Sequence, residues 1–85
     1  MSVSVLSSQL RPESSPNVSI VVPLFNEGEN IRPLYRTLRA GMDRTRYTWE
    51  VIFVEDGSTD NSFRCLREVY QHDAQVSVLR LRRDN

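Results

Sequence analysis

The feature that most constrains the fold is an alternation of short apolar runs with amphipathic segments. Runs rich in β-branched residues occupy residues 18–23 (VSIVVP), 49–54 (WEVIFV) and 76–81 (VSVLRL). The two intervening segments carry apolar side chains at helical spacing, one running to about Met42 and the other to about Gln71. Two strands joined through a helix are normally parallel, with a right-handed crossover. The sequence therefore predicts an α/β fold of order β-α-β-α-β, a partial doubly wound parallel sheet.

The chain divides into an arm and one small folded unit. Residues 1–17 are rich in Ser, contain Pro12 and Pro16, and lack a helical or strand pattern of useful length. We expect them to form a flexible arm. The folded unit is expected to cover residues 18–85.

Candidate caps and turns mark the start of each helix. Asn26 stands where an N-cap would, with Glu29 three residues later, and Asp60 is the expected N-cap of the second helix. Gly57 is expected to supply the positive backbone angle of a tight turn. These structural roles account for the named polar residues near the helix starts without a ligand.

Composition excludes several classes of function. Acidic and basic residues balance to a formal net charge of +0, so no nucleic acid partner is expected. Cys65 is the single cysteine, which rules out an intrachain disulfide and favours a cytoplasmic location. No run of 18 or more apolar residues occurs, so no membrane span is predicted.

The strand ends carry the chemistry. In a parallel sheet, ligands bind beyond the carboxyl ends of the strands, which here lead into PLFNEGEN and EDGSTDNS. Neither loop has the glycine pattern of a phosphate-binding loop. Both offer carboxylates, namely Glu27, Glu55 and Asp56, which accept hydrogen bonds from ribose hydroxyls and base N–H groups. Asp56 is the preferred ligand, whereas Glu55 should point to the opposite side and be solvated or paired with an Arg.

The two loops with their preceding strands carry a recognisable pattern. VSIVVPLFNEGENI followed by WEVIFVEDGSTDNS resembles the opening of family-2 glycosyltransferases of the GT-A fold, especially the polyprenyl-phosphate branch that includes dolichyl-phosphate mannose synthases. The resemblance implies that Pro23, Phe25 and Glu27 help to hold a nucleotide-sugar, and that Val54 and Asp56 hold its base and ribose. The family usually has Tyr at the position of Phe25 and Asp at the position of Glu55.

The same resemblance implies an activity for a longer parent protein. Such enzymes move a sugar from a UDP- or GDP-sugar to a polyprenyl-phosphate or saccharide acceptor, at the cytoplasmic face of a membrane in the lipid branch. They use a divalent metal, Mg or Mn, bound by an Asp-x-Asp motif that does not occur in these 85 residues. The chain is therefore expected to be the N-terminal, nucleotide-binding half of a GT-A domain, truncated and inactive alone, with no catalytic or metal-binding residue of its own. The alternatives are a non-catalytic nucleotide-binding module and a partner-binding α/β fragment.

Overall fold

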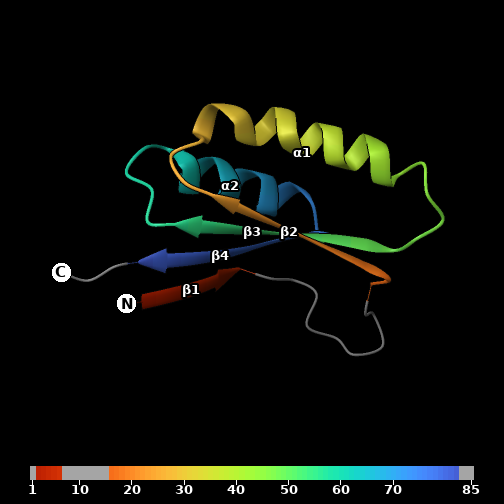
Figure 1. Cartoon of the computed structure of the whole chain (residues 1–85), viewed down its shortest axis with the longest axis horizontal. Helices are drawn as coiled ribbons and strands as arrows, with labels where there is room; N and C mark the ends of the chain where they lie inside the picture. Colours follow the sequence, from red (N-terminus) through yellow and green to blue (C-terminus); the bar gives the residue numbers. More distant parts are fainter. Residues whose placement is uncertain (1, 7–15, 83–85) are drawn as a thin grey trace.

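The computed structural model describes residues 2–6 and 16–82, which form one sheet covered by two helices (Figure 1). The elements are β1 (Ser2–Leu6), β2 (Val18–Leu24), α1 (Gly28–Met42), β3 (Trp49–Asp56), α2 (Ser62–His72) and β4 (Val76–Arg82). The strand order across the sheet is β1-β4-β3-β2. β2, β3 and β4 are parallel, which confirms the predicted α/β class and the β-α-β-α-β order.

The structure corrects the predicted arm at its beginning. Residues 2–6 form β1, which pairs antiparallel with β4, while residues 7–15 lie outside the described part of the chain. The segment SVSVL has the period-2 alternation of a strand, but five residues alternating with Ser carry a weak signal. Residues 2–6 form a strand because they pair with the backbone of β4, which lies more than 70 residues away. The local sequence does not reveal this partner.

Strand β2 continues one residue past the predicted end at Pro23. Proline removes one hydrogen-bond donor from a strand, so it is tolerated mainly where the strand lies at the edge of a sheet. In the described part of the chain β2 pairs only with β3, and it therefore has such an edge. Strand β3 also runs further than predicted and ends at Asp56, so Glu55 and Asp56 belong to the strand itself.

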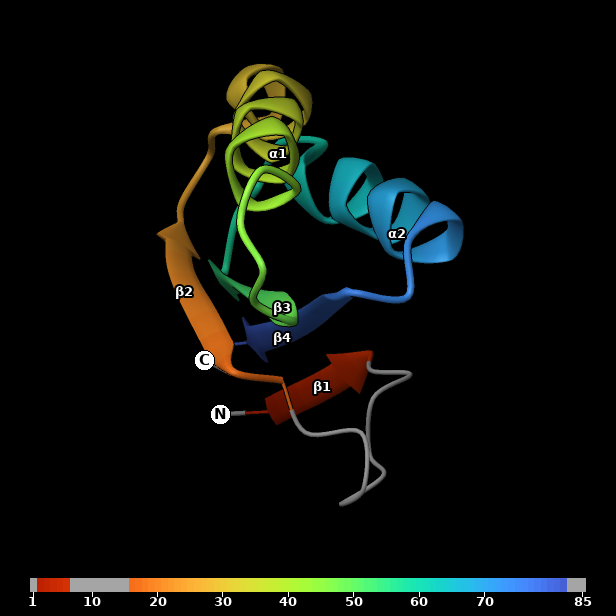
Figure 2. The same ribbon diagram turned by 90° about the vertical axis from the view of Figure 1, so that its right-hand side faces the viewer.

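Both helices lie on the same face of the sheet (Figure 2). The connections β2-α1-β3 and β3-α2-β4 step across the sheet in one direction. Right-handed crossovers that step in one direction place their helices on one side. The described chain thus forms half of a doubly wound arrangement, with one covered face.

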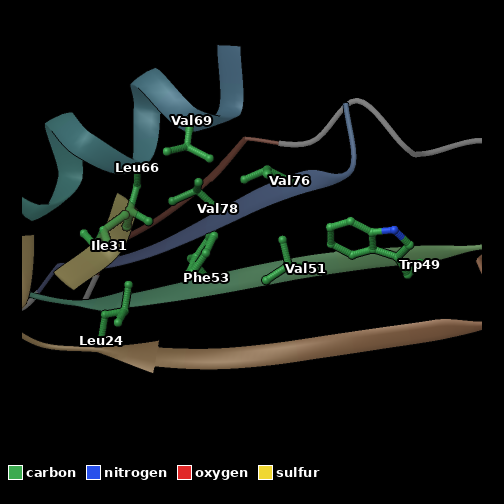
Figure 3. Close-up of a cluster of buried hydrophobic side chains, with 9 residues drawn as sticks. All are labelled: Leu24, Ile31, Trp49, Val51, Phe53, Leu66, Val69, Val76 and Val78. Atoms are coloured by element: carbon green, nitrogen blue, oxygen red, sulfur yellow. The ribbon is translucent and has the colours of Figure 1, made fainter. Parts of the chain in front are cut away.

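The core lies between this covered face and the helices (Figure 3). Every second residue of β3, from Trp49 through Val51 and Phe53 to Glu55, is buried. The helices contribute Ile31 and Leu66, both fully buried. The remaining buried hydrophobic residues of the core are Leu24, Val69, Val76 and Val78. Full burial of such a side chain stabilises the fold by about 1.5–3 kcal/mol.

The opposite face of the sheet is not covered by a helix in the described residues. Val21 of β2 points to this face and is 60% exposed. Ile52 and Val54 of β3 are only half-buried, in contrast to their immediate neighbours Val51 and Phe53. The alternation of side chains along β3 therefore separates a dry face from a wetter one.

Candidate functional site

Three predicted site residues lie on the uncovered face, at the carboxyl ends of the strands. Pro23 of β2 is directly beside Val54 of β3 in the parallel register. Asp56 lies two residues beyond Val54 and therefore on the same face. Pro23 is exposed, and Val54 and Asp56 are half-buried. The strand register therefore places one apolar pair, Pro23 and Val54, and the carboxylate of Asp56 together at the carboxyl ends of β2 and β3.

The other two predicted residues, Phe25 and Glu27, lie on the loop that joins β2 to α1. Phe25 is 58% exposed, which is unusual for a large aromatic side chain and leaves its ring accessible. Glu27 is the N-cap residue of α1, and its side chain makes no capping hydrogen bond. Both side chains are exposed at the end of the sheet that carries Asp56.

Glu55 and Asp56, although adjacent, have different environments. The Glu55 side chain is completely buried on the helix-covered face, where its Oε2 lies 3.3 Å from Nε of Arg80. Its Oε1 accepts the backbone N–H of Ser58. The Arg80 guanidinium stacks over the ring of Phe63, 4.1 Å from its centroid. Of the two predictions for Glu55, pairing with an Arg is confirmed and solvation is wrong.

Arg80 is less exposed than its place in a run of charged residues suggests. The run RLRR at residues 80–83 is most simply a solvated group of charges, yet the Arg80 side chain is only 22% exposed. Its position in β4 opposite Glu55 explains the difference, since the parallel register pairs these two residues directly.

The loops after β2 and β3 are joined by a set of hydrogen bonds, here called the inter-loop array, which consists of Asn26, Gly28, Ser58, Thr59 and Asp60. The backbone N–H of Asn26 donates to Oγ of Ser58 over 2.9 Å. In return, Oδ1 of Asn26 accepts the N–H groups of Thr59 (2.8 Å) and Asp60 (3.3 Å). The Gly28 N–H donates to Oδ2 of Asp60 over 3.2 Å. Bonds therefore run in both directions between the loops.

The array replaces the first predicted N-cap. Asn26 does not cap α1, because the helix begins at Gly28 with Glu27 as the N-cap residue. Asn26 instead adopts a positive φ of 49°, a conformation that Asn tolerates better than most residues. Its side-chain oxygen then bonds to the other loop, 33 residues away in sequence. The expected capping box of Asn26 with Glu29 is therefore wrong.

The second predicted N-cap is displaced by one residue. The N-cap residue of α2 is Asn61, and Asp60 precedes it. Oδ1 of Asp60 still accepts the N–H of Ser62, the first residue of the helix, at 2.9 Å. Asp60 thus satisfies a free helix donor with one oxygen and bonds Gly28 with the other. The predicted turn at Gly57 is confirmed, since its φ is 69°.

The hydrogen bonds donated by Ser62, first from its hydroxyl and then from its N–H, hold the pKa of the Asp60 carboxyl below its ordinary value. A carboxyl with a lower pKa in the folded state stabilises the fold above its unfolded pKa of about 3.9, and this stabilisation disappears as the pH falls through the folded value. We therefore predict that Asp60→Asn is less stable than the unsubstituted chain at pH 6 and that the difference shrinks towards pH 3. Thermal unfolding followed by circular dichroism at both pH values measures this, and a constant difference would contradict it.

A second polar network, missed by the sequence analysis, lies at the other end of the sheet. The Tyr35 hydroxyl donates to Oδ2 of Asp73, and Nη1 of Arg39 donates to the same oxygen over 3.0 Å. Burial raises the pKa of Tyr35, and the hydrogen bond to Asp73 raises it further. The only local sequence signal for this network is the i, i+4 spacing of Tyr35 and Arg39. The network ties α1 to the turn after α2 and is remote from the strand-end loops.

Two surface hollows also lie away from the predicted residues. One, of about 230 Å³, lies between the helices and is lined by Arg32, Tyr35, Arg36, Glu68, Val69 and His72. The other, of about 470 Å³, lies near the start of β3 and is lined by Pro16, Met42, Asp43, Thr45, Tyr47, Thr48, Trp49 and Gln75. Neither includes a residue of the strand-end loops.

The described residues do not fit a metal centre. Within residues 2–6 and 16–82, no three or more His, Cys, Asp and Glu side chains come together in a way that could hold an ion. Glu55 is engaged with Arg80, and both carboxylate oxygens of Asp60 accept hydrogen bonds from N–H groups. No chemical step is therefore assigned to a metal bound by these residues. Neither α1 nor α2, the helices of the described chain, is long and apolar enough to cross a membrane.

Comparison with known protein families shows to which family this chain belongs. Residues 19–85 match the family described as Glycosyl transferase family 2. The chain belongs to this family. The matched part begins within β2 and includes both strand-end loops, so the observed β-α-β-α-β arrangement is the beginning of a GT-A domain.

The chain is also similar to individual curated glycosyltransferases. The chain is 43% identical over 61 residues to the uncharacterized glycosyltransferase YkcC of Bacillus subtilis, covering 72% of this chain and 19% of the relative. It is 38% identical over 69 residues to an undecaprenyl-phosphate 4-deoxy-4-formamido-L-arabinose transferase of Pseudomonas fluorescens, covering 81% and 20%. It is 45% identical over 49 residues to a dodecaprenyl-phosphate galacturonate synthase of Rhizobium johnstonii, covering 58% and 14%. The chain thus spans between 14% and 20% of the length of these curated relatives.

Proposed function

We propose that this chain is the nucleotide-recognising part of a glycosyltransferase that moves a sugar from a UDP- or GDP-sugar to a polyprenyl-phosphate or saccharide acceptor. The observation that carries the proposal is the common position of Pro23, Val54 and Asp56 on one face at the strand ends, next to the exposed Phe25 and Glu27. Family membership supports sugar transfer. The names of two relatives, which specify undecaprenyl and dodecaprenyl phosphate, support a lipid-phosphate acceptor.

Each residue has a role that follows from its chemistry. The accessible ring of Phe25 can stack on a base, an interaction worth about 1–3 kcal/mol per base. Pro23 and Val54 form an apolar pair on the uncovered face of the sheet. The carboxylates of Asp56 and Glu27 are suited to accept hydrogen bonds from base N–H groups and ribose hydroxyls. Carboxylates repel phosphate, so the base and ribose are the parts of the nucleotide that this edge recognises.

In the proposed reaction, an oxygen of the acceptor attacks the anomeric carbon of the sugar; a phosphate acceptor attacks as the anion, and a saccharide hydroxyl would give up its proton to a base on other residues of the full-length enzyme. The bond from that carbon to the nucleoside diphosphate breaks, and the diphosphate leaves with the bonding electrons. The residues of this chain hold the base and ribose, which fixes the position of the leaving group. The divalent metal expected for the full-length enzyme, Mg or Mn, would take its ligands from other residues. A lipid-phosphate acceptor would place that enzyme at the cytoplasmic face of a membrane.

Titration of the chain with UDP and with GDP tests the proposal. We expect one of them to bind and to raise the unfolding temperature, because a ligand that binds only the folded state stabilises it. Asp56→Ala should weaken binding at least about tenfold, the effect of losing one charge-assisted hydrogen bond. Isothermal titration calorimetry measures both affinities.

The matched control is Asp43→Ala, which removes an exposed carboxylate at the opposite end of α1. It should bind the nucleotide as tightly as the unsubstituted chain. Equal binding by Asp56→Ala would contradict the site assignment, and no binding of either nucleotide by the unsubstituted chain would favour a partner-binding fragment. Transfer of radiolabelled sugar by a full-length protein distinguishes an enzyme from a non-catalytic module.

A further inference from the structure

The inter-loop array connects the two loops that carry the proposed nucleotide site. Phe25 and Glu27 flank Asn26 on the first loop, and Asp56 directly precedes the turn of the second. Asn26 contributes both its N–H and its side-chain oxygen to the other loop. The position of one half of the site relative to the other therefore depends on bonds made by a residue that lies between the predicted ligands.

Close packing reinforces these bonds. A Cβ atom on Gly28 would lie 2.1 Å from Oδ1 of Asn61 and 3.4 Å from Oδ2 of Asp60. The first distance is far inside van der Waals contact, so a side chain at position 28 would force the Asn61 amide to move. The close approach of the loops brings the Gly28 N–H within 3.2 Å of Asp60.

We propose that Asn26 and Asp60 are positioning residues, which set nucleotide affinity by holding the two loops together without touching the nucleotide. This inference rests on the proposed function. When only a fraction of molecules has the binding-competent arrangement, the apparent dissociation constant rises by the inverse of that fraction. Loss of the array that lowers this fraction to about a tenth would therefore weaken binding about tenfold.

Two substitutions of Asn26 isolate the side-chain oxygen. Asn26→Gly keeps the positive φ and the N–H bond to Ser58 but removes the acceptor for Thr59 and Asp60. Asn26→Asp keeps an oxygen at the same place and also tolerates the positive φ. We expect Asn26→Gly to weaken binding of UDP or GDP about tenfold, and Asn26→Asp to return the dissociation constant to within about threefold of its original value.

Stopped-flow kinetics distinguish positioning from direct contact. Loss of preorganisation lowers the observed association rate, because fewer molecules can accept the ligand, and leaves the dissociation rate unchanged. Asp56→Ala, a proposed contact residue, should act mainly by raising the dissociation rate. An Asn26→Gly variant with unchanged affinity, or one that acts only on dissociation, would overturn the proposal.

Amide hydrogen exchange examines the array in the chain without nucleotide. The N–H of Thr59 should exchange at least about tenfold faster in Asn26→Gly than in Asn26→Asp, because its acceptor is missing. The Gly28 N–H should respond in the same way to Asp60→Ala and not to Asp43→Ala. Equal exchange in these pairs would overturn the positioning role even if nucleotide binds. Failure of the unsubstituted chain to bind UDP and GDP, with the exchange differences present, would instead overturn the proposed function.

Discussion

Arg80→Met is expected to lower the free energy of unfolding by about 3 kcal/mol. The substitution keeps an unbranched side chain but replaces the guanidinium, which stacks on Phe63 and lies 3.3 Å from the buried Glu55 carboxylate, with an uncharged thioether. Breaking a buried ion pair by removing one partner costs about 3–5 kcal/mol, because the remaining charge has no compensation. Urea unfolding followed by the fluorescence of Trp49, the single tryptophan, measures the change.

A second substitution identifies the cause of this loss. Adding Glu55→Gln to Arg80→Met removes the uncompensated charge, while the amide oxygen of Gln can still accept the N–H of Ser58. The double variant should regain about 1–2 kcal/mol relative to Arg80→Met. Arg36→Met, on the exposed surface of α1, should change stability by no more than about 0.5 kcal/mol. If the double variant were no more stable than Arg80→Met, the buried charge would not be the cause.

Phe53→Ala is expected to lower the free energy of unfolding by about 3–5 kcal/mol. Phe53 is fully buried in the middle of β3, so the substitution loses apolar burial and leaves a cavity. A chain of this size has a total stability near the lower end of about 5–15 kcal/mol. The variant should therefore be largely unfolded at 37 °C, as measured by circular dichroism and urea unfolding.

Phe25→Ala is the matched control, because it deletes the same atoms from a ring that is 58% exposed. Its stability should stay within about 0.5 kcal/mol of the unsubstituted chain. Its affinity for UDP or GDP should nevertheless fall, since the proposed stacking surface is lost. A destabilisation by Phe25→Ala comparable to that of Phe53→Ala would contradict the assignment of Phe25 to the ligand surface.

The fold was predictable where short-range patterns determine it. The β-branched runs and the helical spacing indicated β2, α1, β3, α2 and β4 to within two residues at most of their ends. β1 was missed because its order depends on pairing with β4 and not on its own sequence. β2, β3 and β4 could be predicted because their own residues indicate a strand, whereas β1 depends on a tertiary contact with β4.

The candidate site was predictable in its residues but not in its connections. The alternation of side chains along a strand already placed Glu55 and Asp56 on opposite faces. It did not reveal that Arg80, 25 positions later, pairs with Glu55. The sequence predicts Asn26 and Asp60 as helix caps, because capping is the commonest use of such residues near a helix start. Their bonds across the loops depend on how β2 and β3 are placed side by side.

The adjacent carboxylates of β3 have a consequence for the specificity of strand pairing. Sliding β3 by one residue against its neighbours would turn every side chain to the other face. Asp56, one methylene shorter than Glu55, would then be enclosed beneath the helices, and the Phe53 ring would be expelled into water. Glu55 and Asp56, which differ in length and are followed by the turn at Gly57, thus help to specify the register of β3. A single-step error therefore costs stability both in the middle of β3, at Phe53, and at its end, at Asp56, so the two adjacent carboxylates also disfavour assembly of the sheet out of register.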